Sequence, residues 1–161
     1  MEEKKTYRKL QFENTVSWTS GRRGSLSAAE HPSLEVGSPP AFNGAPDVWC
    51  PEDLLIGALN TCLMLTFLAV ARRRDVPVVA YESGAQGTLE HSEEPGGGRG
   101  GRKYRVTRVK VRPMVSLPEG ANLAAAEEVT RETLASCIIT NSLSATVEFV
   151  PEFRSGSDKA A

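Results

Sequence analysis

The feature that most constrains this chain is an apolar run of 18 residues, LLIGALNTCLMLTFLAVA, at positions 54–71. Pro51 suits the first position of a helix and is followed by two acidic residues, while arginines 72–74 and then Pro77 follow the run. Anions favour the N-terminal end of a helix and cations its C-terminal end. The pattern therefore predicts one helix over 51–74, and because it is apolar nearly all round, we expect it to be buried on all sides.

An apolar run of this length is also at the lower edge of what spans a bilayer, and the arginine triplet suits a cytoplasmic flank. Polar or small residues interrupt the run, and Asn60 would lie in the middle of the bilayer. We therefore expect a core helix and no membrane, with a membrane-anchored or purely structural protein as an alternative. A single domain of 161 residues struggles to cover such a helix completely, which is a first indication of a homodimer.

The segments around this helix show the alternation that is typical of strands. The predicted strands cover 7–18, 25–29, 33–37, 76–90, 102–117 and 143–150, and a second helix covers 120–138. SGRRG at 20–24 predicts a tight turn, and the glycine-rich 91–101 a hairpin connection. The order predicts one α+β domain over 1–161, with its core at about 7–152 and a frayed tail at 153–161.

Two patterns within these elements make sharper predictions. The alternation in 102–117 slips once near Arg108, which indicates a β-bulge. On the second helix an apolar stripe at spacings of three and four predicts a buried face that ends at Cys137. The stripe consists of Leu123, Ala126, Thr130, Leu134 and Cys137.

Composition excludes several function classes. Nineteen basic and twenty acidic residues give a net charge of −1, so nothing indicates a nucleic-acid partner. The sequence starts MEEKKTYRKL, without the apolar region of a secretory signal, and we expect a cytoplasmic protein.

The chain has an odd number of cysteines, which does not suit a structural disulfide framework. They are Cys50, Cys62 and Cys137. They lack C-x-x-C spacing, and His31 and His91 lie in loop-like sequence, so we expect no metal and no cofactor. In a reducing compartment such thiols are reactive or merely buried.

Three motifs resemble those of one family. CPEDLL at 50–55 followed by ALNTC at 58–62 resembles the Asn-Pro-Glu-Glu-Leu-Leu…Ala-Ala-Cys signature of the OsmC/Ohr proteins, the osmotically inducible protein C and organic hydroperoxide resistance group. CIITNSL at 137–143 resembles the second cysteine motif, and TSGR at 19–22 the early Gly-Arg turn. The resemblance covers about 7–152.

The chain also differs from the family pattern at three positions. Ile138 stands where the family often has proline, Arg23 where the strict Ohr form has aspartate, and Cys50 where asparagine or threonine is usual. These differences leave the subfamily open.

The resemblance implies a thiol-dependent peroxidase with an OsmC-like fold, in which antiparallel sheets pack around a long central helix in an interlocked homodimer. Cys62 would attack an organic hydroperoxide and Cys137 would resolve the sulfenic acid to a disulfide. Arg22 would stabilise the Cys62 thiolate, and Glu52 would orient Arg22. The implied reductant is a dithiol, lipoyl or thioredoxin-like. Cys50 is an alternative resolving thiol.

Helix geometry adds a constraint of its own. Ten residues of helix span about 15 Å, so Glu52 cannot reach Cys62 of its own chain directly. If two such helices cross antiparallel near Gly57, Glu52 of one chain lies level with Cys62 of the other. We therefore expect an active site shared within the dimer. The competing interpretation is a non-catalytic protein of the same fold that binds an apolar ligand and uses its cysteines only for packing.

Overall fold

The computed structural model describes residues 9–93 and 102–155. Its contacts divide the chain into two compact units, 1–53 and 54–161. The division falls within the first turn of the long helix α1 (Pro51–Arg73). The prediction that 1–161 forms a single domain stays a prediction.

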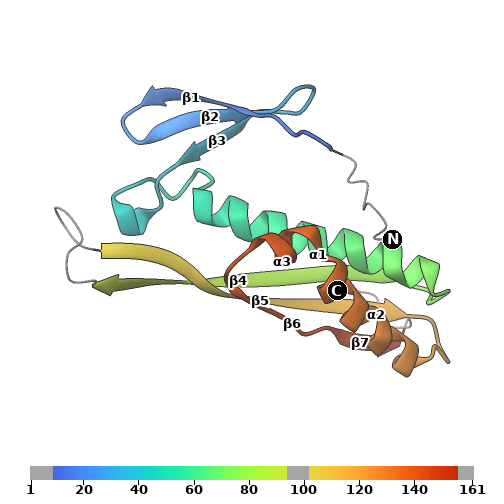
Figure 1. The fold of residues 1–161 in the computed structure, drawn as a ribbon. Helices are drawn as coiled ribbons and strands as arrows, with labels where there is room; N and C mark the ends of the chain where they lie inside the picture. The colour runs from blue at the N-terminus through green and yellow to red at the C-terminus, as the bar shows by residue number, and fades with distance from the viewer. Residues whose placement is uncertain (1–8, 94–101, 156–161) are drawn as a thin grey trace, which may run out of the picture. The chain divides into compact units, whose positions relative to one another are not determined.

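The first unit is built on a three-stranded antiparallel sheet in the order β1-β2-β3 (Figure 1). Its strands are β1 (Thr15–Ser20), β2 (Arg23–Ser27) and β3 (Leu34–Gly37), followed by the 3₁₀ helix η1 (Pro40–Phe42). Gly21 and Arg22 form the turn between β1 and β2, as predicted, and Gly21 has a φ of 51°, which favours glycine. The first strand begins eight residues later than predicted, because it starts where pairing with Ser27 starts.

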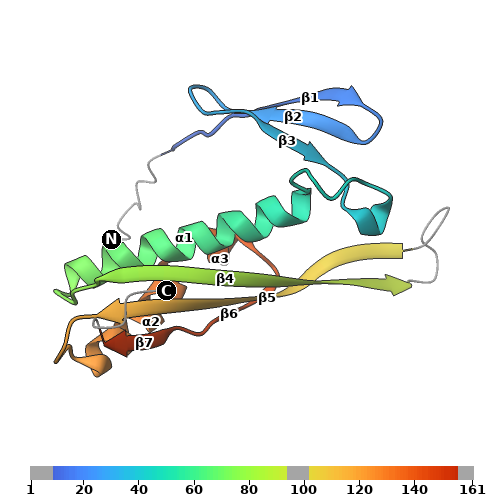
Figure 2. The same cartoon turned by 180° about the vertical axis from the view of Figure 1, so that it is seen from behind.

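The second unit is a sheet with helices packed on it (Figures 1 and 2). Antiparallel β4 and β5 form its long hairpin, and β6 and β7 both pair with β5 in parallel. The elements after α1 are β4 (Ala80–Glu93), β5 (Arg102–Leu117), α2 (Leu123–Ser136), α3 (Ile138–Ser142), β6 (Thr146–Phe149) and β7 (Glu152–Ser155). This α+β arrangement matches the predicted fold class.

The core of this unit lies between one face of the sheet and the helices. Alternate residues of β5, among them Val109, Val111 and Val115, are fully buried in one cluster with residues of α1 and α2. The α1 members include a stripe that recurs every three or four residues, Leu59, Leu63, Phe67 and Val70, with Ala71 beside it. Burial of this stripe fixes which face of α1 meets the sheet. Leu55, which belongs to the apolar run that was expected to be buried, is half-buried.

The single chain does not bury α1 on all sides, and complete burial within a dimer stays a prediction. Leu65 is 58% exposed and Leu68 37%, on the side away from the sheet. The chain covers one face of the helix and leaves an apolar face open. By length and composition alone α1 also meets the criterion for a membrane span.

The predicted bulge is confirmed. Thr88 pairs with Arg108 and Leu89 with Val106, so one extra residue, Thr107, is inserted into β5. The predicted connection at 91–101 lies mostly outside the described residues, although β4 and β5 do form the expected hairpin.

The predicted 120–138 helix is α2, and the short helix that follows it was not predicted. Helix α2 ends at Ser136, and a second short helix, α3, follows Cys137 directly. The buried face of α2 includes Ala126 and continues through Val129 and Thr133, whereas Leu123 is 58% exposed.

The tail prediction was wrong for residues 153–155. They belong to β7, which pairs with Met114–Leu117 of β5 and extends the sheet. Residues 156–161 of the predicted tail lie outside the described part of the chain.

Candidate active site

Two sulfur atoms of the second unit lie against each other. Cys137 Sγ is 3.2 Å from Cys62 Sγ and donates a hydrogen bond to it. Both thiols are free, and the distance is well above the roughly 2.05 Å of a disulfide bond. Cys137 is fully buried, while Cys62 is only partly buried. One sulfur is therefore reachable from outside, and its neighbour is not.

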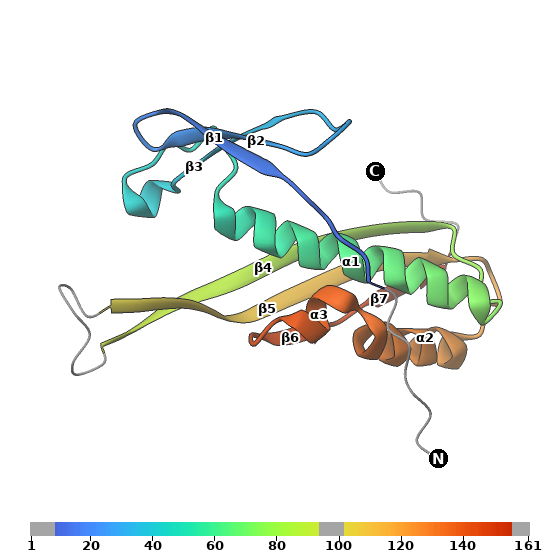
Figure 3. The same cartoon turned by 45° about the horizontal axis from the view of Figure 1, so that its top comes forward.

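The break between α2 and α3 positions Cys137. Its backbone is extended, with φ −67° and ψ 118°, so it ends one helix and begins the next. Its N–H donates to the carbonyl of Thr133 at 2.9 Å, and its sulfur accepts the N–H of Thr140 at 3.5 Å. The cysteine thus caps both helices (Figure 3 shows α3 directly after α2), and these contacts hold its sulfur toward α1.

The surroundings of Cys62 favour its ionised form. Burial raises the pKa of this thiol, but hydrogen bonds from the Ile139 N–H, the Cys137 thiol, the Thr66 hydroxyl and the Ile138 N–H together outweigh burial. The net effect lowers the pKa below its ordinary value. A lowered pKa is what a nucleophilic cysteine needs near neutral pH.

Ile138 contributes to this effect through its backbone. A proline at this position, as the resembled family often has, would carry no N–H and could not donate to Cys62. The side chain of Ile138 is 74% exposed, so its amide rather than its apolar surface meets the thiol.

Cys137 shows the opposite shift. Burial raises its pKa, and so do the hydrogen bond to Cys62 and the charge of Cys62, while the Thr140 hydroxyl and N–H act against them. The net direction is upward. The pair is therefore arranged so that Cys62 ionises more readily than Cys137, whose thiol donates a hydrogen bond to the Cys62 sulfur. This arrangement can supply a nucleophile and then a second sulfur within reach of it.

Cys50 belongs to a different structure, the start of α1. Its sulfur accepts the Asp53 N–H at 3.4 Å, while Asp53 Oδ2 accepts from the Cys50 N–H at 3.4 Å and from its thiol at 3.1 Å. This reciprocal pairing is a capping box with cysteine at the N-cap. Burial, together with the Asp53 and Glu52 carboxylates, raises the pKa of Cys50 to about 11. Cys50 therefore caps the start of α1.

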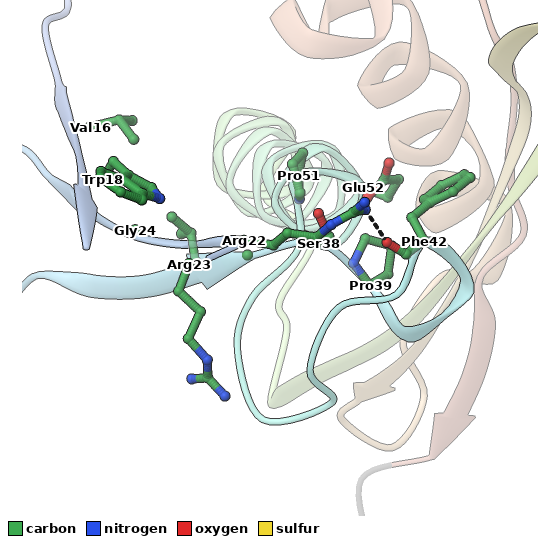
Figure 4. Close-up of a pocket in the computed structure, with 12 residues that line it drawn as sticks. Val16, Trp18, Arg22, Arg23, Gly24, Ser38, Pro39, Phe42, Pro51 and Glu52 are labelled. Atoms are coloured by element: carbon green, nitrogen blue, oxygen red, sulfur yellow. Dashed lines mark hydrogen bonds between the residues drawn. The ribbon is translucent and has the colours of Figure 1, made fainter. Parts of the chain in front are cut away.

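Arg22 and Glu52 line one cavity of about 560 Å³ in the first unit (Figure 4). Arg22 Nη1 donates to the carbonyl of Phe42. Glu52 Oε2 is buried and has no hydrogen-bond partner among the described residues, and the described ion pairs include none between Glu52 and Arg22. Arg23, which replaces the aspartate of the strict Ohr form, pairs with Asp47 at 2.7 Å.

The structure thus groups the four predicted site residues in two pairs. Cys62 and Cys137 meet in the second unit, and Arg22 and Glu52 share a cavity in the first. Sequence reasoning missed Thr66 and Thr140, whose hydroxyls lower the pKa of one thiol each. Their spacing was a signal, since Thr66 follows Cys62 by four residues and Thr140 follows Cys137 by three. Within the described residues no group of three or more His, Cys, Asp or Glu side chains could hold a metal ion.

The family model of OsmC-like proteins matches residues 44–152. The match covers both cysteines of the dithiol pair, the capping box and all the helices of the second unit. The chain belongs to the OsmC-like protein family. Comparison with curated proteins gave no match.

Solved structures share the fold. An OsmC-like protein of unknown function from Vibrio cholerae has a TM-score of 0.74 and 22% identity, covering 91% of this chain and 100% of that one. An organic hydroperoxide resistance protein OsmC from Legionella pneumophila has a TM-score of 0.65 and 17% identity, with 90% and 98% covered. An organic hydroperoxide resistance protein from Elizabethkingia anophelis has the same TM-score and identity, with 92% and 99% covered. At these identities the likeness shows the fold.

Proposed function

We propose that this chain is a cysteine-based peroxidase that reduces organic hydroperoxides to alcohols in oxidative stress defence. The Cys62 thiolate attacks the distal peroxide oxygen, the O–O bond breaks, and the departing alkoxide takes up a proton to become the alcohol. Cys62 is oxidised by two electrons to the sulfenic acid. The Cys137 sulfur then attacks the Cys62 sulfur, hydroxide leaves and is protonated to water, and a disulfide remains. A dithiol returns both sulfurs to thiols.

The observation that carries this proposal is the sulfur pair. Two thiols 3.2 Å apart, one with a lowered and one with a raised pKa, suit an attacking thiolate and a thiol that waits beside it. Cysteines that served only for packing would not need this difference. The partial exposure of Cys62 and the full burial of Cys137 support the same division of roles.

Arg22 and Glu52 enter the proposal through the family resemblance. Arg22 would favour the Cys62 thiolate electrostatically, with Glu52 orienting it, in an active site shared between two copies of the chain. Two features of α1 support a homodimer. A Cβ at Gly57 would meet no atom within 4 Å, and Leu65 on the open face of the helix is 58% exposed. The reductant would be lipoyl or thioredoxin-like, and the location cytoplasmic.

The cavity of the first unit favours one alternative function, the binding of an apolar ligand without catalysis. Val16, Trp18, Val36 and Phe42 give its wall an apolar character. This alternative predicts thiols that stay reduced during exposure to hydroperoxide. The peroxidase proposal predicts that they do not.

Steady-state turnover with cumene hydroperoxide and dihydrolipoamide tests the proposal. Wild type and Cys50→Ser should turn over, whereas Cys62→Ser should not. Cys137→Ser should consume about one equivalent of peroxide and then over-oxidise at Cys62. Full activity of Cys62→Ser, or a wild type whose thiols survive excess hydroperoxide unchanged, would contradict the proposal.

A further inference from the structure

Thr140 lies beside the buried sulfur and has an uncommitted hydroxyl. Its N–H donates to Cys137 Sγ at 3.5 Å, which places the residue against the thiol. Its hydroxyl oxygen is buried and makes no aligned hydrogen bond to any described residue. A buried hydroxyl without a partner costs free energy, so its position needs an explanation. Thr133 and Thr130, by contrast, donate to the carbonyls of Val129 and Ala126 in their own helix.

In the reduced pair the hydroxyl is close enough to lower the pKa of Cys137, but it is not aligned for a hydrogen bond. Cys137 is protonated there and directs its own hydrogen toward Cys62. The charge of Cys62 helps to keep Cys137 protonated. Once Cys62 has become a neutral sulfenic acid, that charge has gone, and Cys137 must lose its proton to attack. At this point a donor beside Cys137 becomes useful, because it stabilises the new thiolate in a buried place.

We propose that Thr140 is a positioning residue for the resolving step: its hydroxyl turns to donate to the Cys137 thiolate after Cys62 has been oxidised. The inference rests on the proposed peroxidase function. The hydroxyl and the N–H of Thr140 then form two hydrogen bonds to one sulfur, and the thiolate attacks the sulfenic sulfur as hydroxide leaves. In the reduced pair the same hydroxyl already favours ionisation of Cys137.

Among the causes that shift the pKa of Cys137 within the described residues, the only charge is that of Cys62. Cys62 is the titratable group that faces it from α1. Several charged groups of the neighbouring elements are engaged in ion pairs. These pairs are Glu132 with Arg73 and Arg74, Glu128 with Arg131, and Glu148 with Arg108 and Lys110.

The experiment separates the two chemical steps. Reduced full-length protein is mixed with one equivalent of cumene hydroperoxide at pH values from 5 to 9. Rapid quenching and mass spectrometry then follow sulfenic acid and disulfide separately. In Thr140→Val the pH midpoint of disulfide formation should rise by about one unit, so the rate at pH 7 falls about tenfold. The rate of sulfenic acid formation should stay within about twofold of wild type.

Three further variants keep the result interpretable. Thr140→Ala also lacks the hydroxyl without adding bulk, and it should show the same shift. Thr140→Ser retains the hydroxyl and should restore the wild-type profile. Thr130→Val removes a hydroxyl that bonds within α2 and should leave both steps unchanged.

The two proposals fail in different ways. Equal pH profiles of disulfide formation in wild type, Thr140→Val and Thr140→Ala would overturn the role of Thr140 while leaving the peroxidase intact. A wild type that forms no Cys62–Cys137 disulfide would overturn the peroxidase proposal and the role of Thr140 with it.

Discussion

Two regions of α1 place a cysteine in opposite electrostatic surroundings. At the start of the helix Cys50 is buried beside carboxylates, and its pKa rises to about 11. Twelve residues later Cys62 faces N–H and hydroxyl donors, and its pKa is lowered despite burial. The residue type is the same and both thiols are shielded from water to some degree. Burial raises the pKa of both thiols, but the carboxylates add to this rise at Cys50, whereas the donors outweigh it at Cys62.

The same comparison explains why each cysteine needs its own local structure. Cys50 is held by the capping box with Asp53, which serves the helix end. Cys62 instead meets the break after α2, where backbone N–H groups of Ile138 and Ile139 have no carbonyl partner in the preceding helix. At the start of α1 the cysteine stabilises the helix end. At the sulfur pair the surrounding backbone lowers the pKa of the cysteine.

The largest expected effect comes from removing the activated thiol. Cys62→Ser should lower peroxide reduction on the order of 10³-fold or more, because the attacking group is lost. The fold should survive, since the volume change is small and an unpaired hydroxyl costs about 1–2 kcal/mol. Turnover and urea unfolding measure the two effects. Comparable activity in Cys62→Ser and wild type would remove the distinction between Cys62 and Cys50.

The second prediction concerns the packing that holds Cys62 in place. Leu63 is fully buried against the sheet, so Leu63→Ala should lower the free energy of unfolding by about 2–5 kcal/mol. Leu65 is 58% exposed, and Leu65→Ala should cost much less in the single chain. Urea unfolding at several protein concentrations compares them. If Leu65→Ala lowers the free energy of unfolding as much as Leu63→Ala does, and this loss grows with protein concentration, a second copy covers the open face of α1.

How far the sequence predicted this architecture depends on the kind of signal. Strand β5 was predicted with its correct bounds, and its bulge was visible, because alternation is a local property. The end of the second helix at Cys137 was predicted to within two residues, but the break that leads directly into α3 was not. Its cause is tertiary: the sulfur accepts the Thr140 N–H and reaches Cys62, contacts that no periodicity records. Strand β7 was missed for the same reason, since its pairing partner is 38 residues away in sequence at Met114↔Glu152.

The site was predictable to a similar extent. The meeting of Cys62 and Cys137 could be anticipated from two motifs and one apolar stripe. The stripe itself was partly wrong, because Leu123 lies outside the buried face. The donors that distinguish the two thiols are backbone groups and threonines, and a sequence does not show which way these point.

The third prediction concerns a substitution that should bring the pKa of Cys50 closer to that of Cys62. Asp53→Asn keeps an oxygen for the capping box but removes the carboxylate charge beside the thiol. The pKa of Cys50 should fall, and its alkylation by iodoacetamide at pH 8 should rise up to about tenfold. Peptide mass spectrometry reads this rate for Cys50, with Cys62 in the same sample as the internal control. An unchanged rate would mean that burial alone keeps Cys50 protonated.

The smallest effect is expected from replacing the structural thiol. Serine is a good N-cap, so Cys50→Ser should change the unfolding free energy by less than about 1 kcal/mol at pH 7. Because the folded pKa of Cys50 is raised, its protonated form stabilises wild type below the unfolded pKa near 9, and this stability is lost as the pH rises toward about 11. The variant should lack that alkaline loss. Thermal melts at pH 8 and pH 10.5 test the difference.

The pH dependence of alkylation at each cysteine tests the central claim most directly. Reduced wild-type protein is pulsed with iodoacetamide across pH 5 to 11, and the modified fraction of Cys50, Cys62 and Cys137 is read separately by peptide mass spectrometry. We expect the pH midpoint of alkylation at Cys62 to lie below the ordinary thiol value. The midpoint at Cys137 should lie above that value, and the midpoint at Cys50 should lie near 11. A midpoint for Cys50 at or below that of Cys62 would contradict the claim that their neighbours set them apart.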